Sequence, residues 1–201
     1  TAVITALFNE AYDKDWQVLC HTNGDAAADQ MFEAMRPAHA SHAVEERRHV
    51  VVHGQLIRID QLDTCAELGI IPSLFPMHTF YWGDWYDEII GEEAAQRISP
   101  TRSALDRLPV ITSHTDAPVA LPNLMQILWS TVNRLSRSGK IMGPDERLTP
   151  MEALLFVQKE KDSSWLRPAL ADFILIFRKP GENAVPIKCD VTNDEWIEWA
   201  R

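Results

Sequence analysis

Four short apolar runs, each bounded by polar or turn-forming residues, recur along the chain. Runs of this length that are rich in Val and Ile are typical of strands in a parallel sheet, where helices cover both faces. The four runs are WQVLCH (16–21), RHVVVH (48–53), GIIPSLF (69–75) and PVITSH (109–114).

Between and after these runs, apolar residues recur at helical spacing. Asp25 and Ser99 are predicted N-caps, and Pro100 suits the first helical position after Ser99. Gly69 is a normal signal for the end of a helix. The pattern predicts helices over residues 25–38, 58–69, 99–108, 121–137 and 149–160.

A strand followed by a helix, four times over, predicts an α/β fold. Each unit has the length expected of a βαβ motif, roughly 30–40 residues. Eight such units close a TIM barrel, so four units make about half of a barrel or an open parallel sheet. The last 40 or so residues differ, because they contain one strand-like run, ADFILIF (171–177), within polar, loop-like sequence.

Histidine or carboxylate side chains follow each predicted strand. The C-terminal ends of parallel strands meet at one edge of a sheet, where function is usually located. Imidazole and carboxylate groups are ordinary zinc ligands, and a nearby carboxylate can take a proton from a metal-bound water. The residues expected at this edge are His21, Asp25, His53, His78, Tyr81, Asp84, His114 and Asp116.

Each of these residues also has a structural interpretation. A single histidine at a strand end is more often a hydrogen-bonded structural residue than a ligand, and Asp25 can be only a helix cap. Tyr81, Trp82 and Trp85 can form a packed loop instead of a substrate wall. The coincidence at four successive strand ends favours the metal site. The histidines expected to be solvated are His39, His42 and His49.

Charge and cysteine content narrow the class of protein. The formal net charge is −10, which argues against nucleic-acid binding because a polyanion would be repelled. No apolar run is long enough to cross a bilayer. Cys20, Cys65 and Cys189 are far apart and odd in number, which indicates reduced thiols in a cytoplasmic protein.

The residues that follow the predicted strands also match a known family. The chain resembles the metal-dependent amidohydrolase superfamily, in particular the amidohydrolase 3 branch, which includes N-substituted formamide deformylases and an exoenzyme regulatory protein. The match covers roughly residues 1–155, and ADFILIF is similar to the closing strand of the family. The matching segments are HTNGDAAADQ, HVVVHGQLIRIDQLDTCAELGIIPSLFPMHTFYWGDW, ISPTRSALDR and ITSHTDAPVALPNLMQILWSTVNRLSRSG.

The resemblance implies a fold and a set of site residues. It implies that residues 1–160 form the C-terminal half of a TIM-like (β/α)8 barrel, strands five to eight, and that residues 161–201 are a divergent remnant of a β-sandwich. His21 and His53 match metal ligands, and Asp116 matches a ligand that also acts as general base. In the family, the histidines hold one ion and the aspartate holds the other. The residues expected near substrate are His78, Tyr81, Trp82 and His114.

The implied activity is hydrolysis of a non-peptide C–N bond in a small amide or formamide, with a divalent metal ion, zinc by preference, as cofactor. The sequence lacks the His-x-His pair of the family's first strand and the lysine of its fourth strand. We therefore expect a portion of a longer enzyme whose partner is a second copy or the missing N-terminal half. Two alternatives stay open: a non-catalytic regulatory protein, and a small-molecule binder that uses the Tyr81–Trp85 cluster.

Overall fold

Four parallel strands form the central sheet of the computed structural model, which describes residues 2–42 and 47–158. The strands are β1 (Leu19–Thr22), β2 (Val50–His53), β3 (Ile71–Leu74) and β4 (Thr112–Ser113), and they pair in chain order β1-β2-β3-β4. Sequential order is what part of a barrel requires, whereas a doubly wound sheet reverses direction at a switch point. The predicted parallel α/β fold is confirmed.

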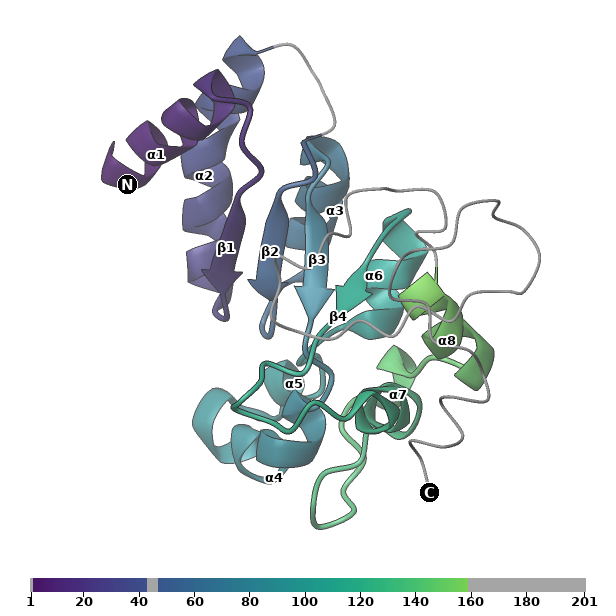
Figure 1. Cartoon of the computed structure of the whole chain (residues 1–201). Helices are drawn as coiled ribbons and strands as arrows, with labels where there is room; N and C mark the ends of the chain where they lie inside the picture. The colour runs from purple at the N-terminus through teal and green to yellow at the C-terminus, as the bar shows by residue number, and fades with distance from the viewer. Residues whose placement is uncertain (1, 43–46, 159–201) are drawn as a thin grey trace, which may run out of the picture.

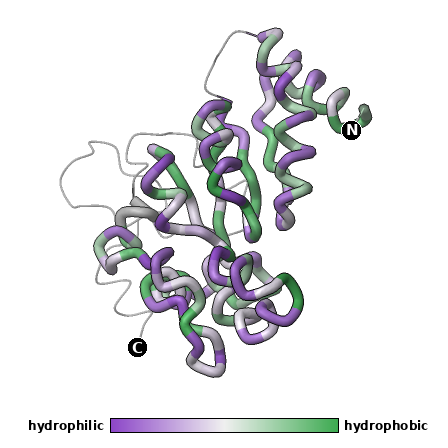
Figure 2. Tube along the Cα trace, turned by 180° about the vertical axis from the view of Figure 1, so that it is seen from behind, coloured by the Kyte–Doolittle hydropathy of each residue, from purple (hydrophilic) through white to green (hydrophobic). Residues whose placement is uncertain are grey.

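The helices bury one face of this sheet. Figure 1 shows α1 (Ala2–Asp13) and α2 (Asp25–Ser41) beside β1, with α3 (Ile59–Leu68) and α6 (Thr101–Arg107) behind the later strands. Cys20, Val51 and Leu74 pack in one apolar cluster with residues of these helices. On the alternate positions Val50 and Ile71 are also buried, whereas Leu19 in the edge strand is 40% exposed. Figure 2 shows hydrophobic stretches along the strands and a mixture of hydrophobic and hydrophilic residues along the helices.

A second group of helices lies at the C-terminal edge of the sheet. It consists of α4 (His78–Ile90), α5 (Glu92–Ala95) and α7 (Leu124–Asn133), toward which the strand arrows in Figure 1 point. A 3-10 turn at Pro144–Glu146 leads to α8 (Pro150–Gln158), which packs on α7 and β4. None of the described helices is long and apolar enough to span a membrane.

Several predicted element boundaries need correction. Residues 78–90, which are not among the predicted helices, form α4, and α7 is shorter than predicted because Arg134 adopts a left-handed backbone conformation. Ser99 and Asp25 are not N-caps, because Pro100 and Gly24 occupy those positions. Thr149 and Glu152 do form the expected start of α8, through reciprocal hydrogen bonds of 2.8 and 3.2 Å. The ADFILIF run and the predicted segment 161–201 lie outside the described residues.

His49 is the clearest error among the surface predictions, because it is buried rather than solvated. Its side chain is 1% exposed, and its Nδ1 accepts a hydrogen bond of 3.0 Å from the Val18 backbone N–H. Burial lowers the pKa of His49 to about 4, and the positive charge of Arg47 adds to this effect. His49 is therefore a neutral core residue in the folded chain.

The free energy of unfolding should fall as the pH drops from about 6.5 to about 4. In this window the unfolded chain takes up a proton at His49 that the folded chain refuses, which costs up to about 3 kcal/mol. We predict that His49→Gln reduces the slope of the unfolding free energy against pH, measured by urea denaturation at several pH values. An unchanged slope in the variant would contradict the assignment of His49 as a buried neutral acceptor.

Candidate metal centre and active site

His53, His114 and Asp116 form one compact group of possible metal ligands. One nitrogen or oxygen atom from each side chain lies within 4.8 Å of the other two. His53 is the last residue of β2, and His114 follows directly after β4. The strand β3 lies between them, with Leu74 paired to both His53 and Ser113, so the two imidazoles converge over its end. Their ring centroids are 4.7 Å apart.

Two of these residues have an unusual backbone conformation: His53 at the end of β2, and Asp116 in the loop after β4. His53 has φ of +77° and Asp116 has φ of +54°, both in the left-handed region that side chains with a Cβ rarely adopt. Such conformations cost on the order of 1–3 kcal/mol each and concentrate at functional sites. Gly54, also at positive φ, directly follows His53, and its N–H donates to the Thr22 carbonyl at 3.1 Å.

Burial keeps the second histidine of the group uncharged at neutral pH. His114 is 6% exposed, and burial lowers its pKa to about 4, with a further contribution from His53. The nearby Asp116 and a hydrogen bond with the Ser73 backbone act in the opposite direction but are smaller effects. A neutral imidazole offers a lone pair, which is what metal coordination requires. Asp116 is partly exposed, so this side of the group faces solvent.

His21 lies beside the group but not within it. Its ring centroid is 4.5 Å from that of His53, and its side chain is exposed at the end of the edge strand. Two other carboxylates expected at this edge have structural partners. Asp84 accepts hydrogen bonds of 3.1 and 2.5 Å from Ser138, and Asp25 pairs with Arg58.

His78, the first residue of α4, lies beside the three possible metal ligands, and a hydrogen bond fixes its ring. Its centroid is 6.2 Å from that of His53, and it is 5% exposed. Burial lowers the pKa of His78 well below its ordinary value, with His53 and His114 adding to the effect. On its other side, Nδ1 lies 2.9 Å from the hydroxyl oxygen of Ser99.

Aromatic side chains form the wall between His78 and α7. Phe75 contacts both histidines, with centroid distances of 4.6 Å to His78 and 5.4 Å to His114. Trp82 lies 5.5 Å from His78, and Tyr81 packs against Trp82 at 5.6 Å. Tyr81 and Trp82 are each partly exposed on α4, so both keep surface open beside the site.

Three residues behind this wall were not predicted from the sequence to support the site. Ser99 carries the hydrogen bond to His78, and its backbone has φ of +47°. Arg134, which is fully buried, donates to the carbonyls of Ser99, Ile98 and Met142 at 2.9, 2.6 and 2.5 Å. The Gln55 carbonyl accepts from the Ser99 N–H at 2.8 Å. A serine before a proline and an arginine in a helix-like stretch give no sign of such roles.

The chain is similar to proteins of one known family. The model of the family described as "Amidohydrolase family" matches residues 1–158. The chain belongs to the amidohydrolase family. Its residues share 28% identity over 138 positions with the N-substituted formamide deformylase of Arthrobacter pascens, and 25% over 197 positions with Protein LONG AFTER FAR-RED 3 of Arabidopsis thaliana. These alignments cover 67% and 96% of the chain.

Two solved structures resemble the amidohydrolase chain. A metal-dependent hydrolase from Pyrococcus furiosus matches 75% of the chain with a TM-score of 0.61 and 25% identity. One from Pyrococcus horikoshii matches 76% with a TM-score of 0.64 and 22% identity, which supports the fold alone. The chain spans a quarter to a third of the length of its relatives: 25% and 33% of the two curated proteins, and 29% and 30% of the two structures.

The donor set fits a divalent metal ion. Two imidazole nitrogens and one carboxylate oxygen, all within 4.8 Å of one another, match the ligand types and spacing of such ions. The similar structure from P. furiosus is described as a metal-dependent hydrolase, which agrees with this interpretation. The group includes His114, which the sequence assigned to substrate contact, and omits His21, which it assigned to metal.

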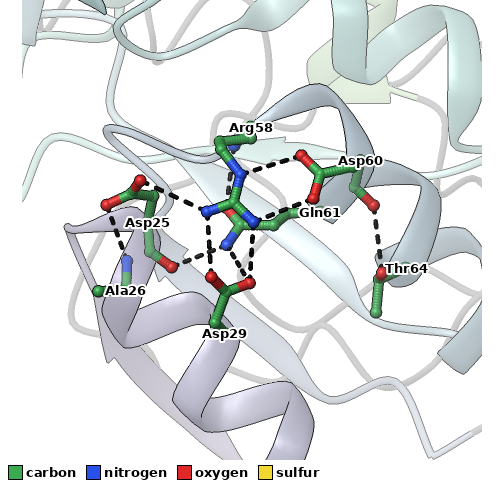
Figure 3. A network of polar contacts seen from close by, with 7 residues as sticks. All are labelled: Asp25, Ala26, Asp29, Arg58, Asp60, Gln61 and Thr64. Atoms are coloured by element: carbon green, nitrogen blue, oxygen red, sulfur yellow. Dashed lines mark hydrogen bonds and ion pairs between the residues drawn. The ribbon is translucent and has the colours of Figure 1, made fainter.

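Arg58 joins the two helices that follow the histidine strands, as Figure 3 shows. Its guanidinium donates to both carboxylate oxygens of Asp29 at 3.1 and 3.0 Å and to both of Asp60 at 3.0 Å. Gln61 donates to the Asp25 carbonyl and to Asp29, each at 2.7 Å. This network ties the start of α2 to the start of α3, next to the loops that leave β1 and β2.

Arg36 pairs with Glu67 in a second link between the same helices, at 2.9 and 3.1 Å.

We predict different consequences for these two links. Arg58→Met leaves three carboxylates facing one another, so the unfolding free energy should drop by on the order of 1 kcal/mol, with the loss decreasing at high salt. Because the loops beside His21 and His53 loosen, the dissociation constant for zinc should rise several-fold. Arg36→Met is the matched control, and its zinc affinity should equal that of the wild-type chain. Equal zinc affinity in both variants would contradict the role of the Arg58 network in holding the site.

Proposed function

We propose that this amidohydrolase chain hydrolyses the C–N bond of a small, non-peptide amide. The convergence of His53, His114 and Asp116 over the end of β3 is the observation that carries the proposal. Two imidazole nitrogens beside a partly exposed carboxylate suit hydrolysis, because a proton acceptor then lies next to an ion-binding position. The name of the A. pascens relative, an N-substituted formamide deformylase, supports an amide-type substrate.

The ion we propose is zinc or a similar divalent cation, held by His53, His114 and Asp116. His21 is near enough to His53 to support a second position, in line with the one or two ions that the family resemblance implies. When bound, the ion supplies Lewis-acid activation of water and of the substrate carbonyl. The burial of His53 and His114, 4% and 6% exposed, keeps bulk water from competing for their nitrogens.

Asp116 is the proposed general base. Its carboxylate accepts a proton from the attacking water as the new C–O bond forms, and returns this proton to the nitrogen as the C–N bond breaks. The left-handed backbone at Asp116 aims the carboxylate across the strand ends, where the loop from β4 turns away. The wall of Phe75, Tyr81 and Trp82 places apolar surface beside the reacting group, so it suits an apolar substituent of the substrate.

We further propose that β1 to β4 correspond to strands five to eight of the family's barrel. The sequential strand order and the match to under a third of each similar structure support a partial barrel, and the family resemblance supplies the strand numbers. In that case the remaining strands lie in a separate polypeptide or in a longer form of the protein. Activity assays should therefore include the chain as it stands and the chain within any longer form.

Replacement of the proposed base should remove activity without unfolding the chain. Asp116→Asn suits this purpose, because asparagine tolerates the left-handed backbone better than most residues and has nearly the same shape. We predict that kcat for hydrolysis of an N-alkylformamide, measured by amine release with zinc present, falls about 10²–10⁴-fold. The thermal midpoint should change little. Retention of wild-type kcat would contradict the role of Asp116.

Loss of a ligand should instead reduce metal content. We predict that His53→Asn, which also tolerates positive φ, lowers bound zinc from about one ion per chain to well below that value, measured by elemental analysis after gel filtration. His42→Asn is the matched control, since His42 pairs with Asp13 on the surface at the other end of α2. Equal zinc content in His53→Asn and wild type would contradict the site.

A further inference from the structure

The tautomer of His78 follows from the hydrogen bonds behind it. The Ser99 hydroxyl oxygen lies 3.0 Å from the Phe75 carbonyl oxygen and 2.9 Å from His78 Nδ1. A carbonyl can only accept, so the single hydroxyl proton of Ser99 is donated to Phe75. The Ser99 oxygen must then accept from His78, and Nδ1 carries the hydrogen. Because neutral imidazole has one N–H, the other ring nitrogen, Nε2, presents a lone pair.

The surroundings leave little freedom for the opposite arrangement. Ser99 is fully buried, and two hydrogen bonds fix its backbone. Its N–H donates to the Gln55 carbonyl, and its own carbonyl accepts from Arg134. Arg134 also holds the preceding Ile98 carbonyl, so the left-handed turn at Ser99 is locked by a buried cation. Ser99 is therefore a positioning residue that fixes the proton of His78 on Nδ1.

Nε2 is the second nitrogen of the His78 ring, which packs at the edge of the site. Among the described residues no hydrogen bond to this nitrogen is present, and it does not belong to the group of atoms formed by His53, His114 and Asp116. The ring packs against His53 at 6.2 Å and against Trp82 at 5.5 Å. A ligand that reaches Nε2 therefore meets an acceptor beside the indole of Trp82.

We propose that His78 Nε2 accepts a hydrogen bond from the substrate N–H, so that the site selects secondary amides over tertiary amides and esters. This inference rests on the proposed amide hydrolysis and adds a specificity determinant to it. Nε2 offers an acceptor, and a site built to receive a hydrogen bond discriminates against a ligand that cannot give one. The same amide keeps its carbonyl free for the centre formed by His53, His114 and Asp116.

The tautomer is tested first, without substrate. In the chain labelled with ¹⁵N-histidine, long-range ¹H–¹⁵N spectra at pH 7.5 should show the His78 hydrogen on Nδ1, and assignment comes from the loss of these signals in His78→Phe. Ser99→Ala should shift the hydrogen to Nε2, and Ser99→Gly is the second variant because glycine accepts the positive φ. A hydrogen on Nε2 in the wild-type chain would overturn the inference.

Specificity is tested by binding, which needs no turnover. Dissociation constants for N-butylformamide, N-butyl-N-methylformamide and butyl formate come from ligand-observed NMR titrations with zinc present. The secondary amide should bind about fivefold to tenfold more tightly than both others in the wild-type chain. The ester lacks the N–H without adding bulk, so it separates hydrogen bonding from steric exclusion. In His78→Phe the three constants should converge.

The outcomes separate this inference from the proposed function. Equal affinities in the wild-type chain, or an unchanged preference in His78→Phe, overturn the role of His78 even if the amide is hydrolysed. A preference that disappears in His78→Phe supports the role of His78 even if no amine is released, in which case the proposed hydrolysis fails alone.

Discussion

In-register pairing of four parallel strands is the constraint on which the site depends. Each strand is hydrogen-bonded to its neighbour in chain order, so all four C-terminal ends lie at one edge. Leu74 of β3 is paired to both His53 and Ser113, which places the residues on either side of β3 at the same level. A one-residue shift in the pairing of β3 with β2 or with β4 would move His53 or His114 away from the other, because neighbouring side chains point to opposite faces.

Regular pairing alone would not bring the side chains together. His53 at the end of β2, Asp116 in the loop after β4 and Ser99 in the supporting layer all adopt left-handed backbone conformations. The energy that holds these conformations comes from the surroundings. The apolar cluster fixes the strands against α2, α3 and α6, and the buried Arg134 fixes the turn at Ser99 through three backbone carbonyls. The site is thus positioned by layers that do not themselves contact substrate.

Periodicity was enough to predict the strand ends and therefore which histidines reach the edge. It did not predict α4, because the segment that begins at His78 is rich in aromatic residues, has no capping side chain and contains Gly83. The structure explains why a glycine lies at position 83. A Cβ there would lie 2.9 Å from Met142 Cγ and 3.2 Å from Ser136 Cβ, so α4 packs closely on the segment after α7. The arrangement at the strand ends depends on backbone torsions, which no spacing rule contains. The family resemblance assigned His114 to the substrate residues, whereas the structure groups it with His53 and Asp116.

The most direct test of this account is anomalous diffraction at the zinc edge from crystals grown with zinc. We predict one strong peak bound by imidazole nitrogens of His53 and His114 and a carboxylate oxygen of Asp116, at about 2.0–2.2 Å from each. A second, weaker peak beside His21 would agree with a two-ion site. Zinc bound elsewhere on the chain, with these three side chains ordered and uncoordinated, would contradict the central claim that the strand ends form a metal centre.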